Sequence, residues 1–259
     1  MPQPKDSSLP EGVHLTQGAR GSLIISDQLV ELLLKSRADY DWPEGTGADK
    51  SQQTILDLEA EAETLLTNPD ASAAHTLIQR VSIWGGNNKK AQKKIDQAGD
   101  GVQTAMLDAV KCLTNPATLE AGIDKLCALP GLRLVMATKV YRFCCPSVGA
   151  AVDRHASYFF NSLPVMNQDG TCSKATAFRR EWQNGKHTTS RLAIYTIGGY
   201  EANRGEYLGH YVPLLSSIAA ALNAMGERYN CAATGHSKPW RPADVEMAAY
   251  YWWARNGAR

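Results

Sequence analysis

An aspartate placed at the start of a helix is the residue of this sequence whose position most clearly suggests chemistry. The chain is interrupted at Cys145-Pro146 and Gly149, and Asp153 then precedes an amphipathic stretch that ends near Leu163. The free N–H groups and the dipole of a helix N-terminus favour a negative charge there. A carboxylate held in this way can stabilise positive charge that develops on a reacting group. The position therefore fits two roles, an electrostatic catalyst or a plain helix cap.

Two helices joined by a tight turn are predicted before this aspartate. Apolar residues at helical spacing predict a first helix that begins near Thr118 and stops at Leu129-Pro130-Gly131. Proline cannot continue the helix there, and glycine can adopt a positive φ. A second helix follows at once and ends before Cys145. The region 118–163 is thus predicted to be a helix, a turn, a helix, a short loop and a third helix.

This stretch resembles a known family. The sequence ALPG ahead of a helix, followed by VDRH at the start of the next one, is similar to the helix-hairpin-helix DNA glycosylases. The likeness is strongest to the branch with the 8-oxoguanine-glycosylase fold, including bacterial members associated with phage defence. The resemblance implies that the hairpin around Gly131 grips a DNA phosphate through backbone amides, and that Asp153 supports loss of the base from a flipped nucleotide. Where the family has a second glycine this chain has Arg133, which could hold a phosphate by charge.

A second stretch, residues 82–95, joins a Gly-Asn turn to a basic helix. Its lysines are Lys89, Lys90, Lys93 and Lys94. The stretch resembles the asparagine-containing loop and helix start of the same glycosylases. That resemblance implies that Asn87 or Asn88 fills the gap left by the flipped base, while the lysines neutralise phosphates. The alternative is a solvated basic helix that follows an ordinary turn.

A lysine in the otherwise apolar second hairpin helix is a candidate nucleophile. Bifunctional relatives attack C1′ with a lysine amine that lies just after the hairpin, where this chain has Leu134 and Val135. Lys139 is one helical turn beyond Val135 and projects from the same face. It could form a Schiff base that leads to strand cleavage, bind a phosphate, or extend from a half-buried helix to solvent. We predict base excision and leave the lyase step open.

The composition limits the possible partners and cofactors. The net charge is +1, so a DNA-binding surface must be a local patch. Cys231 is the only cysteine after Cys172, so the four-cysteine iron–sulfur cluster of some relatives is absent, and we expect no metal and no cofactor. No apolar run approaches the length of a membrane span, and the first residues lack the apolar core of a signal peptide. We therefore expect a cytoplasmic protein that does not act at a membrane.

The predicted organisation is a flexible N-terminus at residues 1–21 and a helix-hairpin-helix glycosylase domain at residues 22–259. The fold class is mostly α, with two helical lobes, and the one strand candidate is Arg191–Ile197. Further helices are predicted from Ser26, at Ile55–Leu66, Ala73–Ile83, Asp100–Leu113 and Tyr207–Met225, and from Pro242 onward. Residues 164–190 are predicted to be loose, and their interleaved cations and aromatics could contact DNA, line a pocket or form a surface insertion. The aromatics of the last helix are expected to pack in the core.

Two main hypotheses of function follow. The first is a monomeric DNA glycosylase that excises a modified base from double-stranded DNA. Its substrate would be a hypermodified phage base, such as glucosylated hydroxymethylcytosine, or 8-oxoguanine. The second is a non-catalytic helix-hairpin-helix DNA-binding module in which Asp153 is only a cap. A helical scaffold without a DNA partner is a third, weaker hypothesis.

Overall fold

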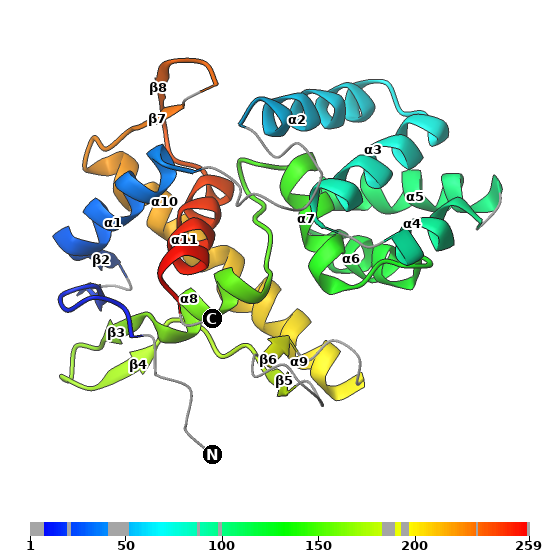
Figure 1. Cartoon of the computed structure of the whole chain (residues 1–259). Helices are drawn as coiled ribbons and strands as arrows, with labels where there is room; N and C mark the ends of the chain where they lie inside the picture. Colours follow the sequence, from blue (N-terminus) through cyan, green and yellow to red (C-terminus); the bar gives the residue numbers. More distant parts are fainter. Residues whose placement is uncertain are drawn as a thin grey trace. The chain divides into compact units, whose positions relative to one another are not determined.

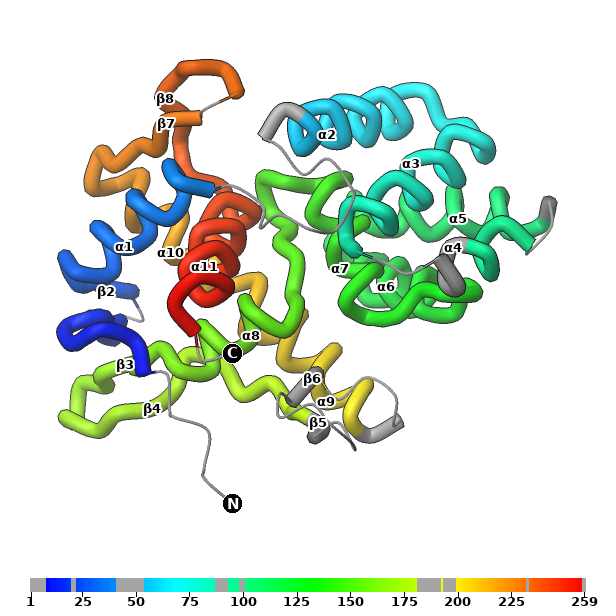
Figure 2. Tube along the Cα trace, in the orientation of Figure 1, coloured from blue at the N-terminus to red at the C-terminus, as the bar shows by residue number. Residues whose placement is uncertain are grey.

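The computed structural model is mostly helical, as the sequence predicted, and its chain divides into two compact units (Figure 1, Figure 2). The structure describes residues 8–19, 22–40, 52–86, 89–97, 100–182, 190–192, 197–231 and 233–257. Unit 1 combines Met1–Tyr40 with Val152–Arg259, and unit 2 is the continuous segment Asp41–Ala151. The chain therefore leaves unit 1, forms unit 2, and returns to unit 1 just ahead of Asp153.

Unit 2 is a helical unit centred on α7. Its helices are α2 (Gln52–Thr67), α3 (Ala71–Trp84), α4 (Lys89–Asp96), α5 (Asp100–Leu113), α6 (Leu119–Ala128) and α7 (Leu134–Cys144). Helix α3 begins where the Asp70 carboxylate accepts a hydrogen bond from the Ala73 N–H at 2.7 Å. Helix α7 contacts α2, α3, α5 and α6, and nearly all of its residues are buried. The hairpin helices α6 and α7 are therefore part of the core of this unit.

A buried ion pair links α7 to α2. The Arg142 side chain is completely buried, and its Nη2 lies 3.0 Å from Glu59 Oε1. The guanidinium carbon also lies 4.3 Å from the centroid of the Phe143 ring. Burying a charge is costly unless a counter-charge comes with it, so this pair indicates that α2 and α7 are specific partners.

Unit 1 combines helices with short strands. Its helices are α1 (Asp27–Ala38), α8 (Arg154–Ser162), α9 (Ile197–Glu206), α10 (Val212–Ala224) and α11 (Pro242–Asn256), with a π-helical segment, η2 (Tyr207–Tyr211), between α9 and α10. Its strands are β1 (Leu15–Gln17), β2 (Leu23–Ile25), β3 (Pro164–Met166), β4 (Cys172–Lys174), β5 (Arg180–Trp182), β6 (Ser190–Leu192), β7 (Tyr229–Cys231) and β8 (His236–Lys238). Helix α11 contacts α1, α8 and α10, and so forms the centre of the unit.

A four-stranded sheet joins the two parts of the chain that make up unit 1. Its order is β2-β1-β3-β4, with β1 antiparallel to β2 and parallel to β3. Leu15 is fully buried and pairs with Ile25 on one side and Val165 on the other. Part of the N-terminal segment that we expected to be flexible therefore forms a strand, which pairs with the nearby β2 and with β3 from far along the chain.

A buried ion pair also joins α1 to α11. Arg37 Nε and Nη2 donate to Asp244 Oδ1 at 3.1 and 3.0 Å, and Arg241 Nε donates to Asp244 Oδ2 at 2.8 Å. The Arg37 guanidinium carbon lies 4.2 Å from the centroid of the Tyr229 ring. Asp244 lies in the first turn of α11, and its carboxylate anchors α1.

The prediction of one continuous helix over Tyr207–Met225 was incomplete. The helix starts earlier, as α9. Its backbone hydrogen-bond pattern changes at η2, where the Val212 N–H donates to the Tyr207 carbonyl five residues back. Pro213 follows and has no N–H to donate, so the ordinary ladder resumes only beyond it. The π-helical segment includes Tyr207 and Tyr211, both of which are fully buried.

Candidate functional site

Asp153 is the N-cap of α8, as the sequence predicted. Its Oδ1 accepts hydrogen bonds from the backbone N–H groups of His155 at 2.9 Å and Ala156 at 3.0 Å. The side chain is half-buried, and Oδ2 makes no hydrogen bond among the described residues. The helix therefore fixes one oxygen of this carboxylate and leaves the other for a further contact.

Two buried tyrosines of unit 1 lie within electrostatic range of Asp153. Burial raises the pKa of Tyr211 well above its usual value, and the charges of Glu246 and Asp153 raise that pKa further. Burial and the charge of Asp153 also raise the pKa of Tyr250. Both phenols therefore stay protonated at neutral pH, so the surroundings of this carboxylate hold neutral hydrogen-bond donors.

Aromatic rings attach α8 to α11. The pairs are His155 with Tyr250, Tyr158 with Trp253 and Phe159 with Trp252, whose ring centroids are 5.2, 5.6 and 5.9 Å apart. The second pair is stacked, with 6° between the ring planes, and the other two are edge-to-face. The prediction that the aromatics of the last helix pack in the core is confirmed for Tyr250 and Trp253, whereas Tyr251 and Trp252 are half-buried. This packing holds the helix that Asp153 caps, and therefore limits how far the carboxylate can move.

The predicted hairpin is present between α6 and α7. The turn after α6 contains Gly131, whose φ of 80° lies in the region that glycine adopts at low cost. Arg133 is the N-cap of α7 but gives it no side-chain cap, and its exposed side chain donates from Nη1 to the Leu132 carbonyl at 2.9 Å. The N–H groups of Leu134 and Val135 have no acceptor among the described residues. The start of α7 thus keeps backbone donors that an anion could accept from.

Lys139 lies inside unit 2. Only 4% of its surface is exposed, and its Nζ donates to the Gly85 carbonyl at 3.1 Å while lying 5.6 Å from the Trp84 ring centroid. A Cβ at Gly85 would collide with the end of the Met136 side chain and press on the Lys139 stem. A side chain at this position would therefore require Met136 and Lys139 to shift. The contact ties α7 to the turn that leads to Asn87.

The remaining predicted DNA contacts are only partly described. Asn87 and Asn88 lie outside the described residues, as do the side chains of Lys89 and Lys90 at the start of α4. Lys93 is exposed in the last turn of that helix. The prediction of a helix after the Gly-Asn turn is confirmed, and the proposed roles of the asparagines and lysines stay predictions.

The predicted site residues belong to different units. The hairpin, Lys139 and the basic helix α4 are in unit 2, and Asp153 is in unit 1. Within unit 2, the Lys139–Gly85 hydrogen bond brings the second hairpin helix to the start of the asparagine turn. The proposed carboxylate chemistry and the proposed lysine chemistry therefore depend on side chains that two separate units supply.

Sequence reasoning did not identify several residues around Asp153. Tyr211 and Tyr250 gave no signal, because buried aromatics at helical spacing predict only a core. Arg180 gave a weak signal as part of the stretch that interleaves cations with aromatics. The structure places its guanidinium against the first turns of α8, where Nη2 donates to Ser157 Oγ at 2.6 Å.

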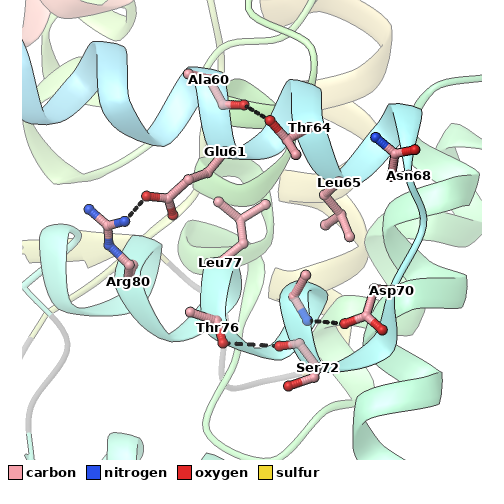
Figure 3. Close-up of a pocket in the computed structure, with 11 residues that line it drawn as sticks. Ala60, Glu61, Thr64, Leu65, Asn68, Asp70, Ser72, Thr76, Leu77 and Arg80 are labelled. Carbon is pink, nitrogen blue, oxygen red and sulfur yellow. Dashed lines mark hydrogen bonds and ion pairs between the residues drawn. The ribbon is translucent and has the colours of Figure 1, made fainter.

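A groove of about 660 Å³ lies elsewhere, between α2 and α3 in unit 2 (Figure 3). Its lining includes Thr64, Asp70, Thr76 and the ion pair of Glu61 with Arg80. Most of these polar groups already have partners within their own helices: Thr64 donates to the Ala60 carbonyl, and Asp70 caps α3. The groove contains none of the predicted site residues.

Other kinds of site find no support in the described part of the chain. No group of three or more His, Cys, Asp or Glu side chains there is arranged to hold a metal ion. None of the described helices combines the length and the apolar character needed to cross a membrane. None of the six cysteines, all of which the structure describes, forms a disulfide bond. Comparison with protein-family models, curated proteins and solved structures gave no match to this chain.

Proposed function

We propose that this protein is a DNA glycosylase with a two-lobed helix-hairpin-helix fold, in which Asp153 is the catalytic carboxylate. The protein would flip a modified base out of double-stranded DNA and cleave its N-glycosidic bond, leaving an abasic site. The observation that carries the proposal is the arrangement of Asp153. It is half-buried, one oxygen is fixed by the start of α8, and the other has no hydrogen-bond partner among the described residues.

This arrangement suits the charge that develops in the reaction. Cleavage of an N-glycosidic bond builds positive charge on the sugar, and a carboxylate beside C1′ stabilises that charge or activates the incoming water. A carboxylate that the helix already orients needs little rearrangement during the reaction. The aromatic packing between α8 and α11 supports this orientation. Asp153 would therefore act through Oδ2 while Oδ1 stays bound to the helix.

Unit 2 would supply the grip on DNA. The uncapped start of α7 offers backbone N–H groups to a phosphate, and the exposed Arg133 adds positive charge beside it. The lysines of α4 would neutralise further phosphates. Extruding a base costs a few kcal/mol of lost stacking, and Asn87 or Asn88 would occupy the vacated space.

The substrate is a modified base of one of two classes. The family resemblance favours 8-oxoguanine, and the resemblance to defence-associated members favours a hypermodified phage base such as glucosylated hydroxymethylcytosine. Strands β3, β4 and β5 lie in the segment 164–190, which could form one side of a pocket for a bulky base. Both classes stand as proposed substrates; this segment and Arg133, which replaces the second glycine of the family pattern, add support for the phage base.

The proposal is tested by measuring base release from two DNAs. Purified wild-type protein and Asp153→Asn would be incubated with a duplex that contains 8-oxoguanine and with T-even phage DNA that carries glucosylated cytosines. An aldehyde-reactive probe would count abasic sites. The Asp70→Asn variant is the matched control, because Asp70 also caps a helix and asparagine caps about as well as aspartate. We expect release by the wild type and by Asp70→Asn, and none by Asp153→Asn.

Strand breaks in the same assay test the role of Lys139. Breaks that appear without alkali, and that are lost in Lys139→Met while abasic sites persist, would identify Lys139 as the Schiff-base nucleophile. Because the amine is buried against Gly85, this role requires the Lys139–Gly85 hydrogen bond to open in the complex with DNA. Abasic sites without breaks would restrict Lys139 to its structural contact.

The alternative function is a non-catalytic DNA-binding module, and the capping geometry of Asp153 is compatible with it. Such a module would bind DNA with the salt dependence typical of phosphate contacts but would release no base from either DNA. Equal behaviour of Asp153→Asn and Asp70→Asn in every assay would favour this alternative.

A further inference from the structure

A half-buried arginine beside Asp153 lacks the ion pair that other buried arginines have. Arg37 lies 3.0 Å from Asp244, and Arg142 lies 3.0 Å from Glu59. Arg180 is half-buried, but it forms no ion pair with a carboxylate among the described residues. Its Nη1 is buried without a hydrogen-bond acceptor in the same part of the chain. A covered cation with no carboxylate at ion-pair distance is costly, and Asp153 offsets that cost only from further away, so this position favours the binding of an anion.

The backbone that leads to Arg180 is held by two asparagine side chains. Asn161 of α8 accepts from the Phe178 N–H at 3.1 Å and donates to the Phe178 carbonyl at 2.9 Å. The fully buried Asn203 of α9 binds the next residue in the same way, accepting from the Arg179 N–H at 2.7 Å and donating to its carbonyl at 3.0 Å. Each side-chain amide thus pairs with both backbone groups of one residue, as the backbone of a neighbouring β-strand would. Together they fix the chain up to the start of β5. The position of Arg180 is therefore built into the fold.

The guanidinium group lies against the N-terminal half of α8. Its Nη2 donates to Ser157 Oγ at 2.6 Å and to the Arg154 carbonyl at 3.3 Å, and its carbon lies 3.4 Å from the centroid of the Tyr158 ring. Burial lowers the pKa of Arg180 to about 10, while Tyr158 and Asp153 counteract this shift. The group thus carries its charge at neutral pH, within electrostatic range of the carboxylate that caps the helix.

We infer that Arg180 binds a phosphate group of the DNA strand beside the nucleotide on which Asp153 acts. The inference rests on the proposed function for the identity of the ligand. A guanidinium group presents parallel N–H donors that match the oxygens of a phosphate. Arg154 is a second cation near Arg180 and lowers its pKa, so an anion at this position would also relieve the repulsion between the two arginines. The binding would position the sugar of the target nucleotide against α8.

The test measures binding to a duplex that contains a tetrahydrofuran abasic-site analogue. Dissociation constants would be determined at several salt concentrations for the wild type, Arg180→Gln and Arg180→Lys. Arg179→Gln is the matched control. The Arg179 side chain precedes Arg180 in the sequence and is exposed, and it makes no contact with α8 like those of Arg180. We expect Arg180→Gln to weaken binding about tenfold. The slope of the logarithm of the binding constant against the logarithm of salt concentration should fall by about one phosphate contact in Arg180→Gln. Arg180→Lys should restore the wild-type slope.

A second measurement identifies the phosphate. One phosphate at a time, on either side of the analogue, would be replaced by a neutral methylphosphonate. For the phosphate that Arg180 contacts, the wild type and Arg180→Gln should bind the modified duplex equally well. If Arg180→Gln instead bound every modified duplex about tenfold more weakly than the wild type, the inference would be overturned. That result would indicate that Arg180 acts through Asp153 or through the fold.

The result distinguishes this inference from the proposed function. Unchanged affinity and salt dependence in Arg180→Gln, with base release still abolished by Asp153→Asn, would overturn the inference alone. A wild-type protein that neither binds the analogue nor releases a base would overturn both. Thermal denaturation of each variant shows whether it is folded, and Arg180→Lys preserves the test if the glutamine variant is not.

Discussion

Two aspartates of this protein do the same structural work in different surroundings. Asp70 caps α3 in unit 2 by accepting one backbone N–H, and Asp153 caps α8 in unit 1 by accepting two. Asp70 is exposed and lines a groove in which Arg80 is already paired with Glu61. Asp153 is half-buried, near protonated tyrosines and the unpaired Arg180. The comparison teaches that a cap becomes a candidate catalyst through its neighbours rather than through its position on the helix.

Replacing each aspartate by serine separates the charge from the cap, and we expect this change to give the largest effect. Serine still accepts a hydrogen bond at an N-cap, so both variants should unfold close to the wild-type temperature. Asp153→Ser should lose base release by about a hundredfold or more, because the negative charge beside the sugar is gone. Asp70→Ser should release base at the wild-type rate. Single-turnover base release and thermal unfolding measure the two effects.

The comparison would fail if Asp153→Ser kept its activity. The cap would then be all that matters at α8, and the two aspartates would be equivalent. Loss of activity in Asp70→Ser as well would point to a general effect on the fold.

The buried tyrosines near Asp153 provide a test of intermediate size. Tyr250→Phe removes a neutral hydroxyl group within electrostatic range of the carboxylate, and we expect base release to fall by about threefold, less than the loss of a direct hydrogen bond to a charged group would cause. Tyr251→Phe changes the next residue of α11, which is half-buried and packs against Tyr40 instead. It should leave the rate unchanged. Equal rates for the two variants would show that the hydroxyl of Tyr250 does not assist Asp153.

The effect of alanine at each cap on stability should be the smallest of these effects, while Asp153→Ala should lose base release as Asp153→Ser does. Losing an aspartate cap lowers the free energy of unfolding by about 1 kcal/mol. For Asp153→Ala the loss should be somewhat larger than for Asp70→Ala, because two N–H groups lose their acceptor instead of one. Urea denaturation, followed by circular dichroism, would measure both. A greater loss in Asp70→Ala would mean that the surroundings of Asp153 compensate for the missing cap.

The sequence predicted the helices because their signals are local. Apolar periodicity, the breaks at Asn68-Pro69 and Pro130-Gly131, and the caps placed α2, α3 and α5–α8 within a few residues of their observed bounds. Asp153 could be found for the same reason, since it directly precedes an amphipathic run. Local patterns therefore identified the helix and the carboxylate that begins it.

What the sequence could not predict depends on residues distant in the chain. Strand β1 is three residues long, too short for an alternating pattern, and one of its two partners, β3, lies about 150 residues further along the chain. The division into two units likewise follows from which helices contact one another. The surroundings of Asp153 come from β5, η2 and α11, whose sequences predicted core packing and, around Arg180, a run of cations and aromatics with no stated relation to Asp153. No spacing rule relates these segments, so only the folded chain brings them near the carboxylate.

The path of the chain through the two units also has a consequence for the order of folding. Unit 2 is continuous, so all its helices are available as soon as Ala151 has been synthesised. Unit 1 is closed by distant contacts, such as β1 with β3 and Arg37 with Asp244. Contacts of large sequence separation form slowly. On the ribosome, the contacts that close unit 1 can therefore form only after α11 has emerged, so Asp153 reaches its final surroundings in the last step of synthesis.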